Sequence, residues 1–190
     1  SVVTAAPGEA AALQVLAAVL SGETGRLYRA LVTEQGKAAM AGAGYDPDAL
    51  DYSPFAVYAV PRGDVALPDL EAAMDAVLAG VRDEAVPEEE LARAKRRLLA
   101  GAIYGQDDPG ALARVFGEAA ALGRSVADVQ GWPGRIAAVK AADVQQAAQT
   151  YLQPPRSVTG LLTRPADATQ AKQRESHVGP ARRGQPRVSR

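Results

Sequence analysis

The stretch VLAAVLSGETGRLYRALVTEQGKAAMAGAGY, residues 15–45, decides the fold that we expect for this chain. Its first part carries leucines one helical turn apart, such as Leu16 and Leu20, and a Ser-Gly pair ends that helix. Thr24 is placed to cap a second helix, and Gly36 is placed to end it in a left-handed conformation. The pattern predicts two helices joined by a tight turn.

Two strands are expected after this helical hairpin. Residues 38–45 are nearly all Ala and Gly, which a strand tolerates where another backbone or a helix lies close. Residues 53–60 are apolar on both faces, with Phe55, Val57 and Ala59 on one and Ala56, Tyr58 and Val60 on the other. We therefore expect 53–60 to be a central strand covered on each side, with 38–45 as an antiparallel neighbour.

Helices dominate the expectation for the rest of the body. Pro68, Pro87 and Pro109 each mark a helix start. The remaining segments are expected to be a strand over 1–6, a short helix from 125 that is broken at 132–134, a helix over 141–152 and a last strand over 157–163. Strands and helices segregated in this way predict an α+β fold, with an antiparallel-rich mixed sheet covered by helices.

Charge and composition divide the chain into a body and a tail. The net charge of the chain is −1, but the charges are unevenly placed. Residues 1–163 contain 14 Lys/Arg and 20 Asp/Glu, whereas residues 164–190 contain 7 Lys/Arg and 2 Asp/Glu. The second segment is rich in Gln, Arg, Pro, Gly and Ser, a composition that buries too little apolar area to offset its ordering entropy. We expect one domain over 1–163 and a basic polar tail over 164–190.

Several site classes are excluded by composition. The chain contains no cysteine, so it forms no disulfide and no Cys-type zinc or redox site. No apolar run approaches the ~20 residues that a membrane-spanning helix needs. Because the sequence begins at Ser1 without Met, we expect that it is cut from a longer parent.

Several separated pieces of the chain, kept in a shared order and spacing, carry a family resemblance. They are residues 16–45, 51–61, 87–95, 107–109, 131–133 and 138–144. Together they resemble the C-terminal-type, non-zinc-binding domain of the insulinase/pitrilysin/mitochondrial processing peptidase superfamily of zinc metallopeptidases. Members run two similar domains in tandem, and two such proteins often pair around a closed chamber. The resemblance implies a metallopeptidase-family half-domain.

The zinc chemistry of that superfamily is missing from this chain. In the family, one domain holds zinc through His-x-x-Glu-His and a distal Glu, and the motif's own Glu activates a water. The only histidine here is His177, in the tail. We expect no catalytic residue, no metal ligand and no cofactor in this chain, and zinc in the parent's other domain. The resemblance also places an Arg and a Tyr, with which some members hold substrate, at Val32 and Ala39, and neither side chain donates that hydrogen bond.

Charged candidates elsewhere in the body have simpler explanations. Asp107-Asp108 and Glu88 to Glu90 stand where a helix N-terminus favours negative charge, so we interpret them as capping and dipole residues. Residues 22–26 resemble a phosphate-binding loop faintly but lack its Lys-Ser/Thr ending. Arg26 and Arg29 could face an acidic partner or a substrate carboxylate, while a solvated helix face is the commoner role of such a pair.

Two further candidates concern partners. Trp132 could anchor an interface, although a partly buried packing role is more common for such a ring. The tail arginines could contact nucleic acid or anionic lipid, but no aromatic residues are interleaved with them for base stacking. We therefore favour a solubilising or linking role for the tail, with no nucleic acid as a partner.

The leading hypothesis is a non-catalytic domain that forms part of a peptide-enclosing chamber and packs against a zinc-bearing domain or partner subunit. The expected parent is a zinc metalloendopeptidase that acts on unfolded peptide, and a homodimer is possible. Two alternatives remain open: a structural or assembly subunit of the same superfamily with no proteolytic role, and a stand-alone protein-binding adaptor. Bacterial relatives are frequently exported, so the resemblance favours the periplasm.

Overall fold

The computed structural model describes residues 2–3, 7–48, 53–106 and 108–163. Two compact units divide the chain, residues 1–158 and 159–190. The elements within the described residues, all in the first unit, are β1 (Val2–Val3), α1 (Pro7–Leu20), α2 (Arg26–Tyr28), the π-helix η1 (Arg29–Glu34), β2 (Ala38–Tyr45), β3 (Ser53–Pro61), α3 (Leu67–Asp83), α4 (Glu88–Gln106), α5 (Pro109–Ala121), α6 (Val126–Gln130), α7 (Trp132–Ala138), α8 (Ala141–Tyr151) and the 3-10 helix η2 (Pro154–Arg156). The fold is α+β, as the sequence predicts.

The strands of the described residues form one antiparallel sheet in the order β1-β3-β2. In the β2–β3 hairpin, Ala41 lies opposite Ala59 and Tyr45 lies opposite Phe55. The register shifts between Ala38 and Met40, which leaves one additional residue in β2 at that point. The central position predicted for β3 is confirmed.

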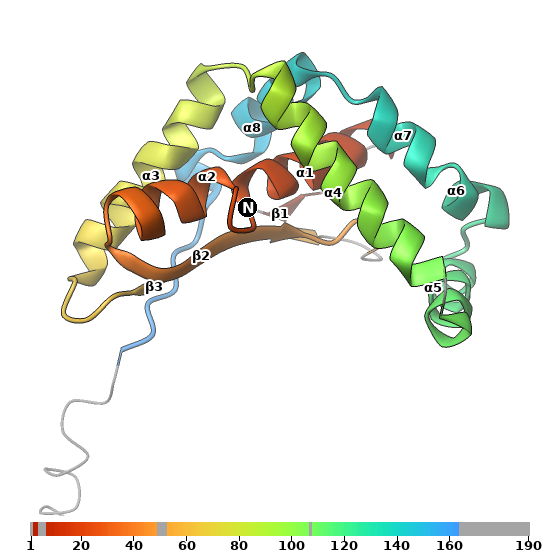
Figure 1. The fold of residues 1–190 in the computed structure, drawn as a ribbon, viewed down its shortest axis with the longest axis horizontal. Helices are drawn as coiled ribbons and strands as arrows, with labels where there is room; N and C mark the ends of the chain where they lie inside the picture. The colour runs from red at the N-terminus through yellow and green to blue at the C-terminus, as the bar shows by residue number, and fades with distance from the viewer. Residues whose placement is uncertain (1, 4–6, 49–52, 107, 164–190) are drawn as a thin grey trace, which may run out of the picture. The chain divides into compact units, whose positions relative to one another are not determined.

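The helices of the first unit lie on one side of the β2–β3 hairpin, except α5, which lies beyond its end (Figure 1). Helices α1 and α2 pack on β2, and α3 contacts β3. Helix α1 is at the centre of the helical layer, in contact with α4, α7 and α8. Its apolar residues are spread around most of its circumference, as expected for a helix that is surrounded by protein.

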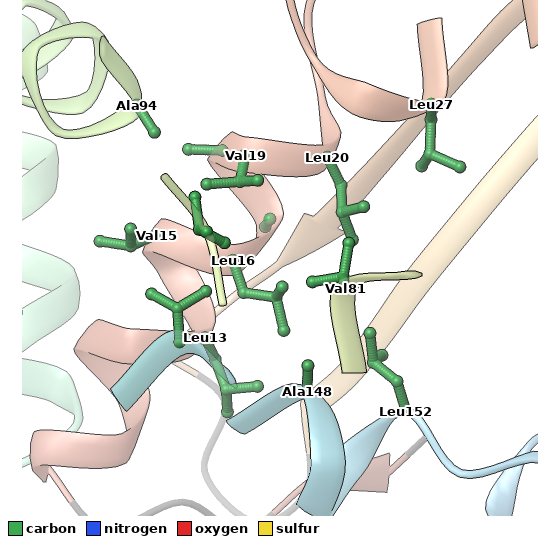
Figure 2. Close-up of a cluster of buried hydrophobic side chains, with 14 of the residues drawn as sticks. Leu13, Val15, Leu16, Val19, Leu20, Leu27, Val81, Ala94, Ala148 and Leu152 are labelled. Atoms are coloured by element: carbon green, nitrogen blue, oxygen red, sulfur yellow. The ribbon is translucent and has the colours of Figure 1, made fainter. Parts of the chain in front are cut away.

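The core is built around α1. Leu13, Leu16 and Leu20 of this helix are completely buried. Figure 2 shows them in one cluster with Val81 of α3 and Ala148 of α8. Many neighbouring core residues are alanines, whose small side chains allow helices to approach the sheet and one another closely. The abundance of Ala therefore corresponds to close packing.

Helix-end signals in the sequence are largely confirmed. The Asp108 carboxylate accepts a hydrogen bond from the Gly110 N–H at 2.8 Å, and Ser125 with Asp128 forms a capping box. Hydrogen bonds from Ser125 lower the pKa of Asp128. Gly36 has a φ of 63° and ends the π-helix as predicted. Asp107 lies outside the described residues.

The cap expected at Thr24 is a wrong prediction. Gly25 occupies the N-cap position of α2 and offers no side chain to the helix. The Thr24 hydroxyl instead accepts a hydrogen bond from Arg97 Nη1 at 3.1 Å. Local sequence could not show this, because the competing donor comes from α4. The break expected at 132–134 is also displaced, since α7 begins at Trp132.

The last predicted strand, residues 157–163, is also contradicted. No strand is assigned there, and Val158 and Leu162 are 97% and 95% exposed. Alternating side chains favour an extended backbone, but a strand also needs a hydrogen-bonding neighbour, which the alternation itself does not supply.

Candidate functional site

One face of the β2–β3 hairpin points away from the helices. It differs more than any other part of the structure from what the sequence predicts. The sequence predicts cover on both faces of β3, but Ala56, Tyr58 and Val60 are exposed on one of them. The register places Met40 opposite Val60 on the same face. Met40, Tyr58 and Val60 are 54%, 51% and 48% exposed, respectively. We call this surface, made by Met40, Gly42, Gly44, Ala56, Tyr58 and Val60, the open face.

Tyr58 is the largest side chain of the open face, and it lies across the opposite strand. A Cβ placed on Gly42, its register partner, would come within 2.7 Å of the Tyr58 hydroxyl oxygen and 2.9 Å of the ring carbon Cζ. Gly42 is consequently buried although it is on the open face. The absence of a side chain at Gly42 therefore gives the phenol ring its place on the sheet.

Two cations stand at one end of the open face. Lys37 and Arg62 continue the register of β2 and β3 by one pair, and the Arg62 N–H donates to the Lys37 carbonyl at 2.9 Å. Alternation along β3 puts Arg62 on the same side as Tyr58 and Val60. Among the described residues, neither cation takes part in an ion pair.

The helices that cover the opposite side of the hairpin are joined by a specific ion pair. Arg26 of α2 makes a bidentate ion pair with Glu90 of α4, with both nitrogen–oxygen distances at 2.9 Å. Their side chains are only 16% and 12% exposed. The solvated helix face expected for Arg26 is therefore wrong, and Glu90 does more than complement a helix dipole. Arg29 and Glu34 form a more exposed pair at 3.5 Å.

A second set of contacts ties the end of α1 to the strand edge and to α4. The Ser21 hydroxyl donates to the Ala43 carbonyl and accepts from the Ala43 N–H at 2.7 Å. Arg97 donates to the carbonyls of Ala18 and Ser21, which satisfies the C-terminal end of α1. The phosphate-loop-like residues 22–26 lie within this turn, and its polar groups are used to hold the fold.

Val32 and Ala39, the positions predicted to correspond to the family's assisting Arg and Tyr, lie in different environments. Val32 is buried in the π-helix η1, with 7% exposure. Ala39 is exposed at the register shift of β2, beside Met40 of the open face. A π-helix is rare and is frequently found at functional sites, a signal that helical periodicity alone does not reveal.

Metal-binding geometry is not found within the part of the chain that the structure describes: no three His, Cys, Asp or Glu side chains there are grouped to hold an ion. His177 and the tail arginines lie outside that part.

Trp132 packs against the core, and its indole N–H donates to Gln14 Oε1 at 2.7 Å. None of the described helices has the length and apolar character needed to cross a membrane.

Comparison with protein families adds one match. Residues 3–98 match the model of the peptidase M16 inactive domain. This stretch runs from the last residue of β1 into α4 and includes α1, α2, α3, β2 and β3, with the whole open face. No curated protein matches the sequence significantly.

Solved structures share the fold. A structure described as the "inactive peptidase domain of a putative zinc protease" from Bordetella parapertussis has a TM-score of 0.74 and 23% identity, over 87% of this chain and 90% of that one. A protease from Helicobacter pylori has a TM-score of 0.72 and 19% identity over 78% of this chain. The present chain spans only 36% of that protease chain.

Proposed function

Because the chain belongs to the peptidase M16 inactive-domain family, we propose that it is the non-catalytic domain of a zinc metallopeptidase. It forms one wall of a chamber that encloses unfolded peptide, and it packs against a zinc-bearing domain that this sequence does not contain. The zinc protease named for the Bordetella parapertussis neighbour supports this choice of parent. The catalytic chemistry then takes place on the other domain, and this domain contributes a surface that contacts the enclosed peptide.

The open face is the observation that supports this proposal best. The hairpin buries one apolar face against the helices. On its other face, Met40, Tyr58 and Val60 are contiguous and remain about half exposed. Side chains of this kind contact an extended chain without demanding one sequence, because apolar contacts are non-directional. We propose that this face, and not the helical layer, lines the space that holds the peptide.

The position of Ala39 supports the same orientation. The resemblance places there the Tyr with which other members help to hold substrate over zinc. Ala39 is exposed and next to Met40 in β2, so a substrate held from this position would run close to the open face. An alanine makes no hydrogen bond through its side chain, so we propose that this domain contributes apolar contact without the assisting pair.

A reconstituted enzyme tests this proposal. The chain is combined with the zinc-bearing His-x-x-Glu-His domain of the parent protein, and cleavage of a quenched unfolded peptide is followed. We expect the isolated chain to be inactive, the mixture to be active, and a Met40→Ser/Tyr58→Ser double variant to lower kcat/KM about tenfold or more.

The matched control is Val115→Ser/Val126→Ser, which removes exposed apolar side chains from α5 and α6. This variant is expected to keep full activity. Equal losses in the two double variants would contradict the assigned face. A mixture that assembles tightly but cleaves no peptide, or a parent without a zinc motif, would instead favour the structural-subunit alternative.

A further inference from the structure

We propose that the open face selects extended peptides that carry an Asp or Glu side chain two residues from an apolar one, with Lys37 and Arg62 receiving the carboxylate. This inference rests on the proposed function, since it names the substrate class of the same face. The apolar side chain of the peptide would lie on Val60 and Met40, and the next side chain on that face would reach the two cations.

The placement of the two cations is unfavourable unless something neutralises them. Lys37 and Arg62 occupy directly opposed positions at the end of the hairpin, where like charges destabilise the pairing. Glu34, the nearest carboxylate in sequence to Lys37, pairs with Arg29. The repulsion between Lys37 and Arg62 is therefore not offset by an ion pair with any described residue. Unfavourable placements of this kind are typical of functional sites.

Spacing connects the cations to the apolar part of the open face. Side chains on one face of an extended chain recur every two residues, roughly 6.5 to 7 Å apart. Tyr58, Val60 and Arg62 follow this repeat on β3. A peptide laid along the strand has the same repeat, so an acidic residue two positions from an apolar residue places its carboxylate at Arg62 while the apolar side chain stays on Val60.

Charge complementarity favours a peptide carboxylate over nucleic acid. The cationic end consists of two side chains, and Val60 separates them from the one exposed ring of the open face, Tyr58, whereas single-stranded nucleic acid is bound along a basic groove with successive stacking rings. The body as a whole is acidic, with 20 Asp/Glu against 14 Lys/Arg over residues 1–163. A phosphate chain carries many negative charges and would be repelled by this net charge more strongly than a peptide with a single carboxylate.

The test uses the full 190-residue chain and two synthetic peptides with blocked ends. Both alternate Leu and Ser, and one position two residues after a Leu is Glu in the first peptide and Gln in the second. Binding is followed by amide chemical shifts of β2 and β3 during titration. We expect the Glu peptide to bind about fivefold more tightly, and Lys37→Gln/Arg62→Gln to abolish that difference while the Gln peptide binds unchanged.

Three controls make the outcomes separable. Arg114→Gln/Lys140→Gln, on α5 and before α8, should leave the preference intact. Tyr58→Ser should weaken both peptides alike, and its failure to do so would contradict the proposed function itself. If Tyr58→Ser acts as expected but Glu and Gln peptides bind equally, only the acidic preference is overturned. Tighter binding of oligothymidylate through Lys37 and Arg62 would also overturn it.

Discussion

The two faces of the β2–β3 hairpin have nearly the same apolar composition and opposite surroundings. Tyr45, Phe55 and Val57 point toward the helices, where Phe55 is buried and stacks on Tyr45 with ring centroids 6.4 Å apart. Tyr58 and Val60, one residue out of phase, remain about half exposed. The difference teaches that apolar side chains in this hairpin serve stability on one face and are available for contact on the other.

The largest expected effect separates the faces by stability. Phe55→Ala removes a buried ring from the covered face and should lower the free energy of unfolding by about 3–5 kcal/mol. Tyr58→Ala on the open face should cost under about 1 kcal/mol, because Tyr58 is already about half exposed to water. Urea unfolding followed by circular dichroism measures both, and equal losses would remove the distinction.

A smaller effect concerns the ion pair that fixes the covering helices. Glu90→Ala leaves Arg26 without its partner in a largely buried position, and we expect a loss of about 2 kcal/mol. Glu89→Ala is the matched control one position away, since the Arg93–Glu89 pair is mostly exposed and should cost under about 0.5 kcal/mol. A Glu90 variant as stable as the Glu89 variant would show that the pair does not hold α2 to α4.

The link between α1 and the edge of β2 should contribute less. Ser21→Ala removes two hydrogen bonds to the backbone of Ala43 and should cost about 1 kcal/mol. Amide exchange is the more specific measurement, because the Ala43 N–H loses its acceptor while β2–β3 pairing is retained. Unchanged protection of the Ala43 amide in Ser21→Ala would exclude this contact in solution.

The smallest effect is a dependence on pH from the covered face. Burial, followed by the charge of Asp46, raises the pKa of Tyr45 above 10.0. The folded state therefore keeps a proton that the unfolded chain releases, so this contribution to stability is present below pH 10 and is lost as pH rises through the folded pKa. Tyr45→Phe should lose less stability than the wild type between about pH 9 and 11 in urea titrations. Parallel losses would contradict the assignment to Tyr45.

Local signals in the sequence predicted the helices, both long strands and most caps, because each depends on residues close in sequence. Asp108, Ser125 and Gly36 are examples. The same reasoning failed for residues 157–163 and Thr24, where a missing strand neighbour and the distant donor Arg97 decide the outcome. Such partners are absent from any local window.

The open face was not predicted, because the apolar residues on both faces of β3 were interpreted as cover on both faces. Alternation along β3 identified two apolar faces, but a period of two carries no information about whether helices cover one face or both. The ion pair of Arg26 with Glu90 joins residues 64 positions apart and was likewise hidden. The sequence resemblance identified the peptidase family, and only the structure revealed the open face.

Site-specific photocrosslinking in the assembled, zinc-containing enzyme tests the central claim most directly. Benzoylphenylalanine replaces Tyr58 on the open face or, in a separate variant, Val126 on α6, and each is irradiated with a labelled unfolded peptide. We expect the peptide to be joined to the chain through position 58 and not through position 126. Equal crosslinking at both positions, or crosslinking at 126 alone, would contradict the assignment of the open face to the peptide.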